Sequence, residues 1–321
     1  MSKMSNKVRF IPLETETAGP QVQQRSVVYK ITETGALVIS TLVLLATFAI
    51  NGLSSVPNHQ KYGFKYTIAN VSSMFYTQIT PAGYTFAIWG VIYLCQIAWI
   101  VYGWTFMCRK SAVNTISPFT YIAYAVANLT NIAWIYVWDN LYIKVAAGVL
   151  FLSAISLYIS LGSAAYYLYT QTSTLSKNDP KDLHTTRILV LNSLAIYMTW
   201  VTIASLIGLT TVLQYFTSIG AVAAGTTSLS ILAVIVLVYF ILENTILDRY
   251  LRYVGIVYPV LIWALTGSVV AHWGKETDGQ NPVITVVLLA VSILLFLVRI
   301  VLWIVFSKIR PLQQTVKSVV V

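Results

Sequence analysis

The sequence predicts an all-α, polytopic membrane helix bundle with about eight transmembrane helices, and three observations support this fold class. Of the 321 residues, 57% are hydrophobic and 9% are charged, whereas a soluble domain carries roughly a quarter charged residues. The hydrophobic residues form long apolar runs that short polar segments separate. The Lys and Arg residues lie mainly in alternate separators, which is typical of cytoplasmic loops in membrane proteins.

The apolar runs are long enough to cross a bilayer. A hydrocarbon core about 30 Å thick needs roughly 20 apolar residues in a helix, because a helix satisfies its backbone polar groups internally. Eight runs meet this requirement: 36–56, 84–107, 118–138, 142–169, 188–213, 217–242, 250–273 and 283–306. Polar or helix-breaking residues stand between them: Pro57, Gly63, Arg109, Lys110, Asp139, Asn140, the segment 177–182, Glu243, Asn244 and the segment 274–282. The boundary near Gln214 is the weakest, so seven spans is the alternative count.

The chain then has four parts. Residues 1–34 form a polar cytosolic tail. Residues 1–30 lack the apolar core of a signal peptide, and we expect them to be disordered. Residues 35–213 hold the first five spans and residues 214–307 the last three. Residues 308–321 form a short basic C-terminal tail.

The distribution of basic residues predicts the orientation. Fifteen of the 20 Lys and Arg residues lie in the two tails and the even-numbered loops, and four lie in the odd-numbered loops. We therefore expect an integral, multi-pass protein with cytosolic N- and C-termini, in a membrane that the sequence does not identify. The lipid bilayer is the expected partner. Because the basic residues form no continuous polar face, the net charge of +10 does not indicate nucleic-acid binding.

Few ionisable residues lie within the spans. We expect Arg299 to snorkel from the eighth helix to the headgroups. We expect Asp139 to be a hydrated carboxylate at the end of the third helix, with a ligand or proton site as the alternative. The motifs of metalloproteases, α/β-hydrolases and P-loop proteins are missing from the sequence, and Cys95 and Cys108 are too few for a metal cage. We therefore expect neither an enzyme nor a metal site.

Aromatic and amide side chains within three of the helices are the other candidates for function. They are Trp89 and Tyr93 on the second helix, Asn128, Asn131 and Trp134 on the third, and Tyr197 and Trp200 on the fifth. Asn128, Asn131 and Trp134 are spaced by three residues and so share one helix face. An Asn at mid-membrane needs a partner, and an interhelical hydrogen bond and a contact with a ligand are both open.

Three segments resemble a known family. PAGYTFAIWGVIYL, from Pro81 to Leu94, is similar to the start of the second helix of the translocator protein family, also called TspO/MBR or tryptophan-rich sensory proteins. ANLTNIAWIYVWDN, from Ala127 to Asn140, resembles the Asn-x-x-Trp pattern of the third helix. LNSLAIYMTWVTIASLIGL, from Leu191, resembles the fifth helix, with its aromatic-x-x-Trp pair. The resemblance covers roughly residues 36–213.

The chain departs from the short members of that family in two ways. Three further spans follow the five-helix part, and Tyr136-Val137-Trp138 replaces the usual phenylalanine pair after the third-helix Trp. The chain thus resembles a long, TspO-related form.

The resemblance implies a five-helix bundle with a pocket for a flat hydrophobic ligand, such as a porphyrin or a sterol. The residues that it implies for this pocket are Trp89, Tyr93, Asn128, Asn131, Trp134, Tyr197 and Trp200. Aromatic faces and an amide suit such a ligand.

Two other functions and a homodimer stay open. A transporter of small molecules would use broken helices at mid-membrane, for which Gly220, Gly225 and Pro259 are the candidates. A heptahelical receptor would need an extracellular N-terminus, against the distribution of basic residues. Small residues on the fourth helix, such as Gly148 and Gly162, favour close helix contacts within one chain or between two.

Overall fold

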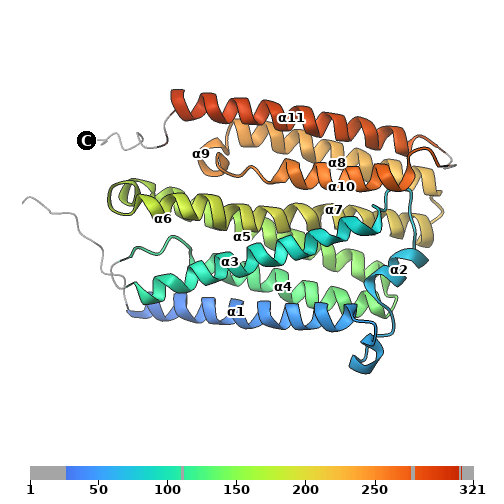
Figure 1. Cartoon of the computed structure of the whole chain (residues 1–321), viewed down its shortest axis with the longest axis horizontal. Helices are drawn as coiled ribbons and strands as arrows, with labels where there is room; N and C mark the ends of the chain where they lie inside the picture. The colour runs from blue at the N-terminus through green and yellow to red at the C-terminus, as the bar shows by residue number, and fades with distance from the viewer. Residues whose placement is uncertain (1–26, 110–111, 276–278, 311, 313–321) are drawn as a thin grey trace, which may run out of the picture.

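The computed structural model describes residues 27–109, 112–275, 279–310 and 312. Within these ranges, eight helices of 16 residues or more run side by side (Figure 1). They are α1 (Val27–Ser55), α3 (Ile88–Cys108), α4 (Pro118–Asp139), α5 (Ile143–Asn178), α7 (Leu191–Phe216), α8 (Ala221–Asn244), α10 (Val257–His272) and α11 (Asn281–Ile309). The short elements are η1 (His59–Tyr62), α2 (Ile68–Met74), η2 (Gly83–Ala87), α6 (Pro180–Thr185), the π-helical turn η3 (Thr186–Val190) and α9 (Asp248–Leu251).

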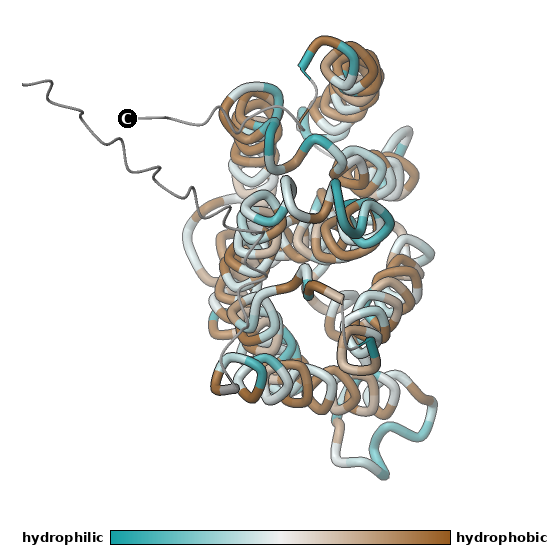
Figure 2. The backbone as a smooth tube through the Cα atoms, turned by 90° about the vertical axis from the view of Figure 1, so that its left-hand side faces the viewer, coloured by the Kyte–Doolittle hydropathy of each residue, from teal (hydrophilic) through white to brown (hydrophobic). Residues whose placement is uncertain are grey.

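The helices are those of a membrane protein. By length and composition, six segments among the described residues can cross a membrane. The long helices outside this set are α4, which carries Asn, Tyr and Trp side chains, and α10, whose 16 residues span ~24 Å. Figure 2 looks nearly along the helices and shows apolar residues on the helices and hydrophilic residues mainly in the turns. The predicted all-α membrane helix bundle is confirmed.

Helix α4 lies between α1 and α5, and α7 packs against α5 on one side and against α8 and α10 on the other. Helix α11 packs on α8 and α10 at the edge of the bundle (Figure 1). The interior near α3 is aromatic: the rings of Trp99 and Tyr121 stack at 5.6 Å, and both side chains are fully buried. Gln96 accepts a hydrogen bond from Trp99 Nε1 at 2.7 Å and donates one to the Ser193 carbonyl at 2.6 Å, which joins α3 to α7.

The turn between the fifth and sixth predicted spans is clear in the structure. Helix α7 ends at Phe216 and α8 begins at Ala221, with Gly220 as its N-cap in an extended conformation. The predicted seventh span, 250–273, is wrong at its start, because α10 begins at Val257. Pro259 explains this difference: a proline ring clashes with the carbonyl four residues earlier, so the helix cannot extend far ahead of it.

The helix breaks expected of a transporter do not occur at the candidate residues. Gly220 precedes α8, Gly225 lies inside this continuous helix, and Pro259 is in the first turn of α10. The small residues of α5 are divided between two environments. Ala164 and Ala165 are buried within the chain, whereas Gly148 and Gly162 face outward. The homodimer stays a prediction.

Helix α1 begins at Val27, so the expected disorder over residues 1–30 is wrong for the last four of them, and the helix takes in the last eight residues of the predicted tail 1–34. This early turn of the helix is held by the segment before α4, since Glu33 is buried and accepts a hydrogen bond from Asn114 Nδ2. Residues 1–26 lie outside the described residues. Most of the expected C-terminal tail, 308–321, also lies outside the described residues. Its first two residues belong to α11, which ends at Ile309.

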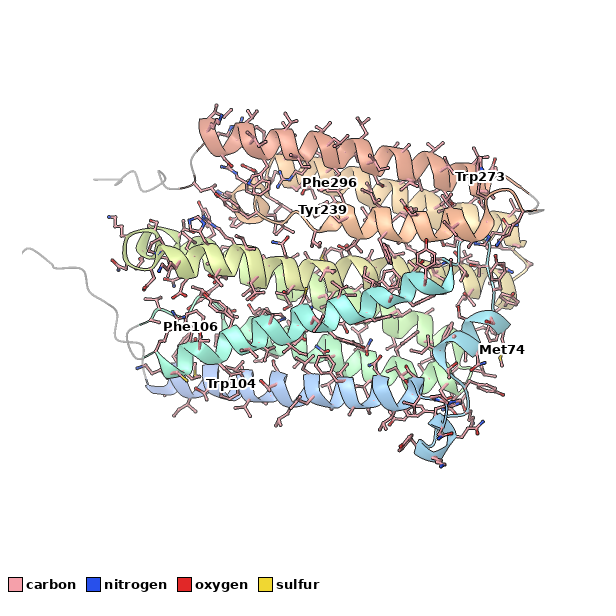
Figure 3. All side chains as sticks on the ribbon, in the orientation of Figure 1. Met74, Trp104, Phe106, Tyr239, Trp273 and Phe296 are labelled. Carbon is pink, nitrogen blue, oxygen red and sulfur yellow. The ribbon has the colours of Figure 1, made fainter. Side chains whose placement is uncertain are left out.

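The start of α1 and the end of α11 lie at one end of the bundle, together with α6 and α9 (Figure 1). Helix α2 lies at the opposite end. Trp104 and Phe106, near the end of α3, mark the first of these two ends, and Trp273, just after α10, marks the second (Figure 3). The loops for which the sequence predicts one side of the membrane thus share one end of the bundle.

Two predictions about single charges are wrong. Arg299 does not snorkel: it is 3% exposed and forms an ion pair with Glu243. Asp139 is 3% exposed and not hydrated, because its Oδ1 accepts hydrogen bonds from the backbone N–H groups of Lys65 and Tyr66, each at 2.6 Å. Both side chains bind buried groups from distant segments of the chain. Their position near a helix end does not reveal these partners.

Candidate functional site

A cavity of about 1180 Å³ opens between α1, α2, η2, α3 and the end of α10. It lies in the half of the bundle that contains α2 (Figure 1). Aromatic side chains line it from three helical elements: Phe48 on α1, Phe86 on η2, and Trp89 and Tyr93 on α3. A cavity of this size with apolar walls can hold a small organic molecule.

The sequence of α3 builds one wall of the cavity. Phe86, Trp89, Gly90, Tyr93 and Ile97 recur at spacings of three and four residues, so they share one face of the helix. The rings of Trp89 and Tyr93 lie 5.6 Å apart, and Phe48 of α1 meets Tyr93 edge-on at 4.8 Å. The aromatic wall therefore continues from α3 onto α1.

Tyr197 and Trp200 of α7 form a second layer behind this wall. Both are almost fully buried and do not line the cavity. Trp200 meets Phe86 at 5.9 Å and Trp89 at 6.4 Å, and Tyr197 meets Trp89 at 5.9 Å, all edge-on. These contacts fix the rotamers of the rings that do face the cavity.

The candidates on α4 are placed differently. Asn131 accepts a hydrogen bond from Asn51 Nδ2 at 3.0 Å. Asn51 lines the cavity, so Asn131 contacts a cavity residue but does not line the cavity itself. Asn128 donates to the Tyr124 carbonyl at 3.0 Å within its own helix. Trp134 stacks on Trp138 at 5.5 Å, and neither ring lines the cavity. The interhelical hydrogen bond expected of a membrane Asn is thus present at Asn131.

Several polar atoms near the cavity are buried without a hydrogen-bond partner among the described residues. They include the Tyr93 hydroxyl and the indole N–H group of Trp200, and the Asn128 Oδ1 atom and the indole N–H group of Trp134 on α4 are buried without a partner as well. An unpaired buried donor costs about 1–3 kcal/mol, so groups of this kind often mark sites that water or a ligand completes.

Residues of α1 and of the end of α10 also build the site, and the sequence motifs do not identify them. Phe48, Asn51, Gly52 and Ser55 line the cavity from α1. Their spacing of three and four residues in an otherwise apolar helix is a signal that could have identified them. Val270, Ala271 and Lys275 come from the end of α10 and the turn after it, and no local pattern places these three residues beside α1.

Helix α10 is joined to the cavity rim by hydrogen bonds. The Ala82 N–H donates to the Gly267 carbonyl at 3.0 Å, and Trp263 Nε1 donates to the Thr85 carbonyl at 2.9 Å. The His272 ring bonds the Thr80 carbonyl through Nε2 at 2.9 Å. A carbonyl only accepts, so Nε2 carries the proton.

Tyr76 completes this rim. Its hydroxyl lies 3.0 Å from Nδ1 of His272, which accepts the hydrogen bond when the ring is neutral. Burial raises the pKa of Tyr76, so the hydroxyl keeps its proton and can donate. The Tyr76 carbonyl in turn accepts a hydrogen bond from the Tyr215 hydroxyl at 2.8 Å. Lys275 adds a positive charge at the same rim.

The comparisons with known proteins give one family. A family model described as TSPO-like protein matches residues 37–301. This match extends through α8 and α10 and over most of α11, beyond residues 36–213, which the resemblance of the sequence motifs covers. Searches of curated proteins and of solved structures found no match. The matched segment covers most of the chain, and we conclude that this multi-pass membrane protein belongs to the TSPO-like family.

Proposed function

We propose that this protein binds or senses a flat hydrophobic molecule, porphyrin-like or sterol-like, in the cavity between α1, α2, α3 and α10. Membership of the TSPO-like family suggests ligand binding or sensing by a membrane protein in general. The observation that carries the more specific proposal is the continuous aromatic wall of Phe48, Tyr93 and Trp89 along a cavity of about 1180 Å³.

The shape and chemistry of the cavity suit a molecule of several fused or linked rings. Its volume lies just above the range of about 300–1,000 Å³ that is usual for small-molecule sites. Aromatic rings attract a flat ligand by stacking or edge contacts. Asn51, Ser55 and Ser72 offer polar groups at one side, where hydroxyl or carboxyl groups of the ligand can bond.

Gly90 gives a direct test of the cavity. It lines the cavity, and a Cβ atom placed on it meets no other atom within 4 Å. The variant Gly90→Leu therefore fills ligand space without a clash inside the protein. Gly148→Leu on α5 is the matched control, because Gly148 is also helical with open space around it but faces away from the cavity.

The measurement is quenching of tryptophan fluorescence by protoporphyrin IX in detergent micelles, with cholesterol as a competitor. We expect saturable quenching in the wild type and in Gly148→Leu, and at least about tenfold weaker binding in Gly90→Leu. Displacement by cholesterol would extend the proposal to sterols. Equal titrations for the two leucine variants would place porphyrin binding outside this cavity and contradict the proposal.

A further inference from the structure

Arg187 is a buried cation without an anionic partner. It lies in the π-helical turn η3 at the start of α7 and is 7% exposed. The other buried arginines are paired, Arg252 with Asp248 and Arg299 with Glu243. Among the described residues, no carboxylate or carbonyl accepts a hydrogen bond or forms an ion pair with the Arg187 guanidinium. A charge removed from water in this way is costly unless something pairs with it.

Two carboxylates at the same end of the bundle as Arg187, on α6 and α9, bind other arginines. Asp182, five residues earlier, binds Arg109 at 2.9 Å and accepts from the Tyr102 hydroxyl at 3.1 Å. Asp248 holds Arg252. Arg252 lies close enough to repel Arg187 electrostatically, so the surroundings of Arg187 gain further positive potential.

The position of Arg187 is fixed by its neighbours. Its guanidinium lies 4.7 Å from the centre of the Tyr253 ring, a cation–π contact. Asn192 Nδ2 donates to the Arg187 carbonyl at 3.1 Å and to the Tyr253 carbonyl at 2.9 Å. The Asn192 Oδ1 atom accepts from the Gly255 N–H at 2.9 Å. One amide thus holds the π-turn and the segment after α9 together, which preorganises the cation.

The guanidinium is not fully enclosed by the protein. Its nitrogens lack a partner in the described part of the chain, yet none of them is among the fully enclosed polar atoms without one. Tyr253 also contacts Trp303 of α11 edge-on at 6.1 Å, and Trp303 is 42% exposed on the outer face of the bundle. Tyr and Trp at such positions are typical of the interface between hydrocarbon and headgroups.

We propose that Arg187 forms a binding site for a phosphate group, with Tyr253 and Trp303 beside it, at the end of the bundle that contains α6 and α9. Guanidinium presents a planar fork of donors that matches phosphate oxygens. A phospholipid headgroup supplies such a phosphate, and its acyl chains can lie along Trp303. Free phosphate has the same recognition chemistry without the chains.

The test uses the full-length protein in dodecyl maltoside micelles, a detergent that carries no phosphate. Phosphatidic acid is added in one arm and inorganic phosphate in a second, and binding is followed by the rise in thermal midpoint. The variants are Arg187→Gln and the control Arg249→Gln, which removes an exposed arginine from the same end of the bundle. We expect phosphatidic acid to bind the wild type and Arg249→Gln alike, and Arg187→Gln at least about tenfold more weakly.

Stabilisation by inorganic phosphate equal to that by phosphatidic acid would assign free phosphate to the site. Equal binding of phosphatidic acid by wild type and Arg187→Gln would overturn the proposal. Should Arg187→Gln not fold, Arg187→Lys keeps the charge and loses the planar fork, and we expect it to bind several-fold more weakly than wild type. An Arg187→Lys variant with wild-type affinity would overturn the proposal as well.

Discussion

Glu243 and Arg299 form an ion pair in the interior of the bundle, with Oε2 of Glu243 3.4 Å from Nε of Arg299. The two side chains are 0% and 3% exposed. Arg299 also donates to Asn244 Oδ1 at 2.7 Å and to the Leu251 and Arg252 carbonyls, each at 3.2 Å. This single side chain therefore connects α8, α9 and α11.

The ion pair belongs to a larger polar cluster. The Tyr258 hydroxyl of α10 donates to Glu243, and the Tyr258 ring stacks on Phe296 at 6.1 Å. Tyr239 and Phe296 flank the same region between α8 and α11 (Figure 3). Four C-terminal elements thus meet at one buried carboxylate, which fixes their register.

We predict that Arg299→Met destabilises the protein by about 3–5 kcal/mol, because it leaves the Glu243 carboxylate buried without its cation. The double variant Arg299→Met with Glu243→Gln removes this charge and should recover much of the loss. Unfolding by denaturant in mixed micelles measures both. Arg249→Gln is the control, since Arg249 is exposed and forms no ion pair among the described residues, and the expected cost is below about 1 kcal/mol. A small effect of Arg299→Met, comparable to that of the control, would mean that the cluster does not hold the helices together.

The fold class could be predicted from the sequence because a bilayer restricts the secondary structures that can cross it. Each span needs about 20 apolar residues in a helix, and this rule alone locates runs such as 118–138, which becomes α4 from Pro118 to Asp139. Ser117 also explains the start of α4, since its hydroxyl accepts a hydrogen bond from the Thr120 N–H at 3.1 Å. These are local effects, and local patterns reveal them.

The role of Arg299 could not be predicted in the same way. Its partner Glu243 is 56 residues away and looks like part of a polar turn in the sequence. The walls of the cavity could likewise be predicted only in part. A helix-face pattern identifies Trp89 and Tyr93, but the α10 wall depends on a tertiary contact between Gly267 and the segment before α3.

That contact can be tested through Gly267. A Cβ atom at this position would collide with the Thr85 side chain of η2. We predict that Gly267→Ala destabilises the protein by about 1–3 kcal/mol, because α10 and η2 must separate. Gly162→Ala on α5 is the control, since nothing lies within 4 Å of its Cβ position. It should be neutral or slightly stabilising, because Ala favours a helix over Gly. Thermal unfolding in detergent gives the comparison, and a Gly267→Ala protein as stable as wild type would argue against the close approach.

We expect substitution of Trp89 to weaken porphyrin binding and substitution of Asn131 to lower the stability of the protein. Trp89→Leu removes part of the cavity wall, so we predict at least about tenfold weaker porphyrin binding. Asn131→Ala removes the hydrogen bond to Asn51 and should cost about 0.6–2 kcal/mol of stability. Because Asn131 does not line the cavity, porphyrin affinity should change by less than about threefold. A large loss of affinity in Asn131→Ala with an intact fold would show that the ligand reaches deeper than the cavity wall.

Cys108 allows the orientation of the bundle to be measured with a native side chain. It is exposed at the end of α3, at the end of the bundle for which the basic residues predict the cytosol. Cys95 is half-buried within the same helix and should not react with a polar maleimide. In cells that are made to carry the protein at their surface, we therefore expect an impermeant maleimide to leave sealed cells unlabelled at Cys108 and to label it after permeabilisation. The variant Lys61→Cys in η1, placed in a Cys108→Ala background, is the control from the opposite end, and it should be labelled without permeabilisation. Labelling of Cys108 in sealed cells would reverse the predicted orientation, and the basic end of the bundle, Arg187 included, would then face away from the cytosol.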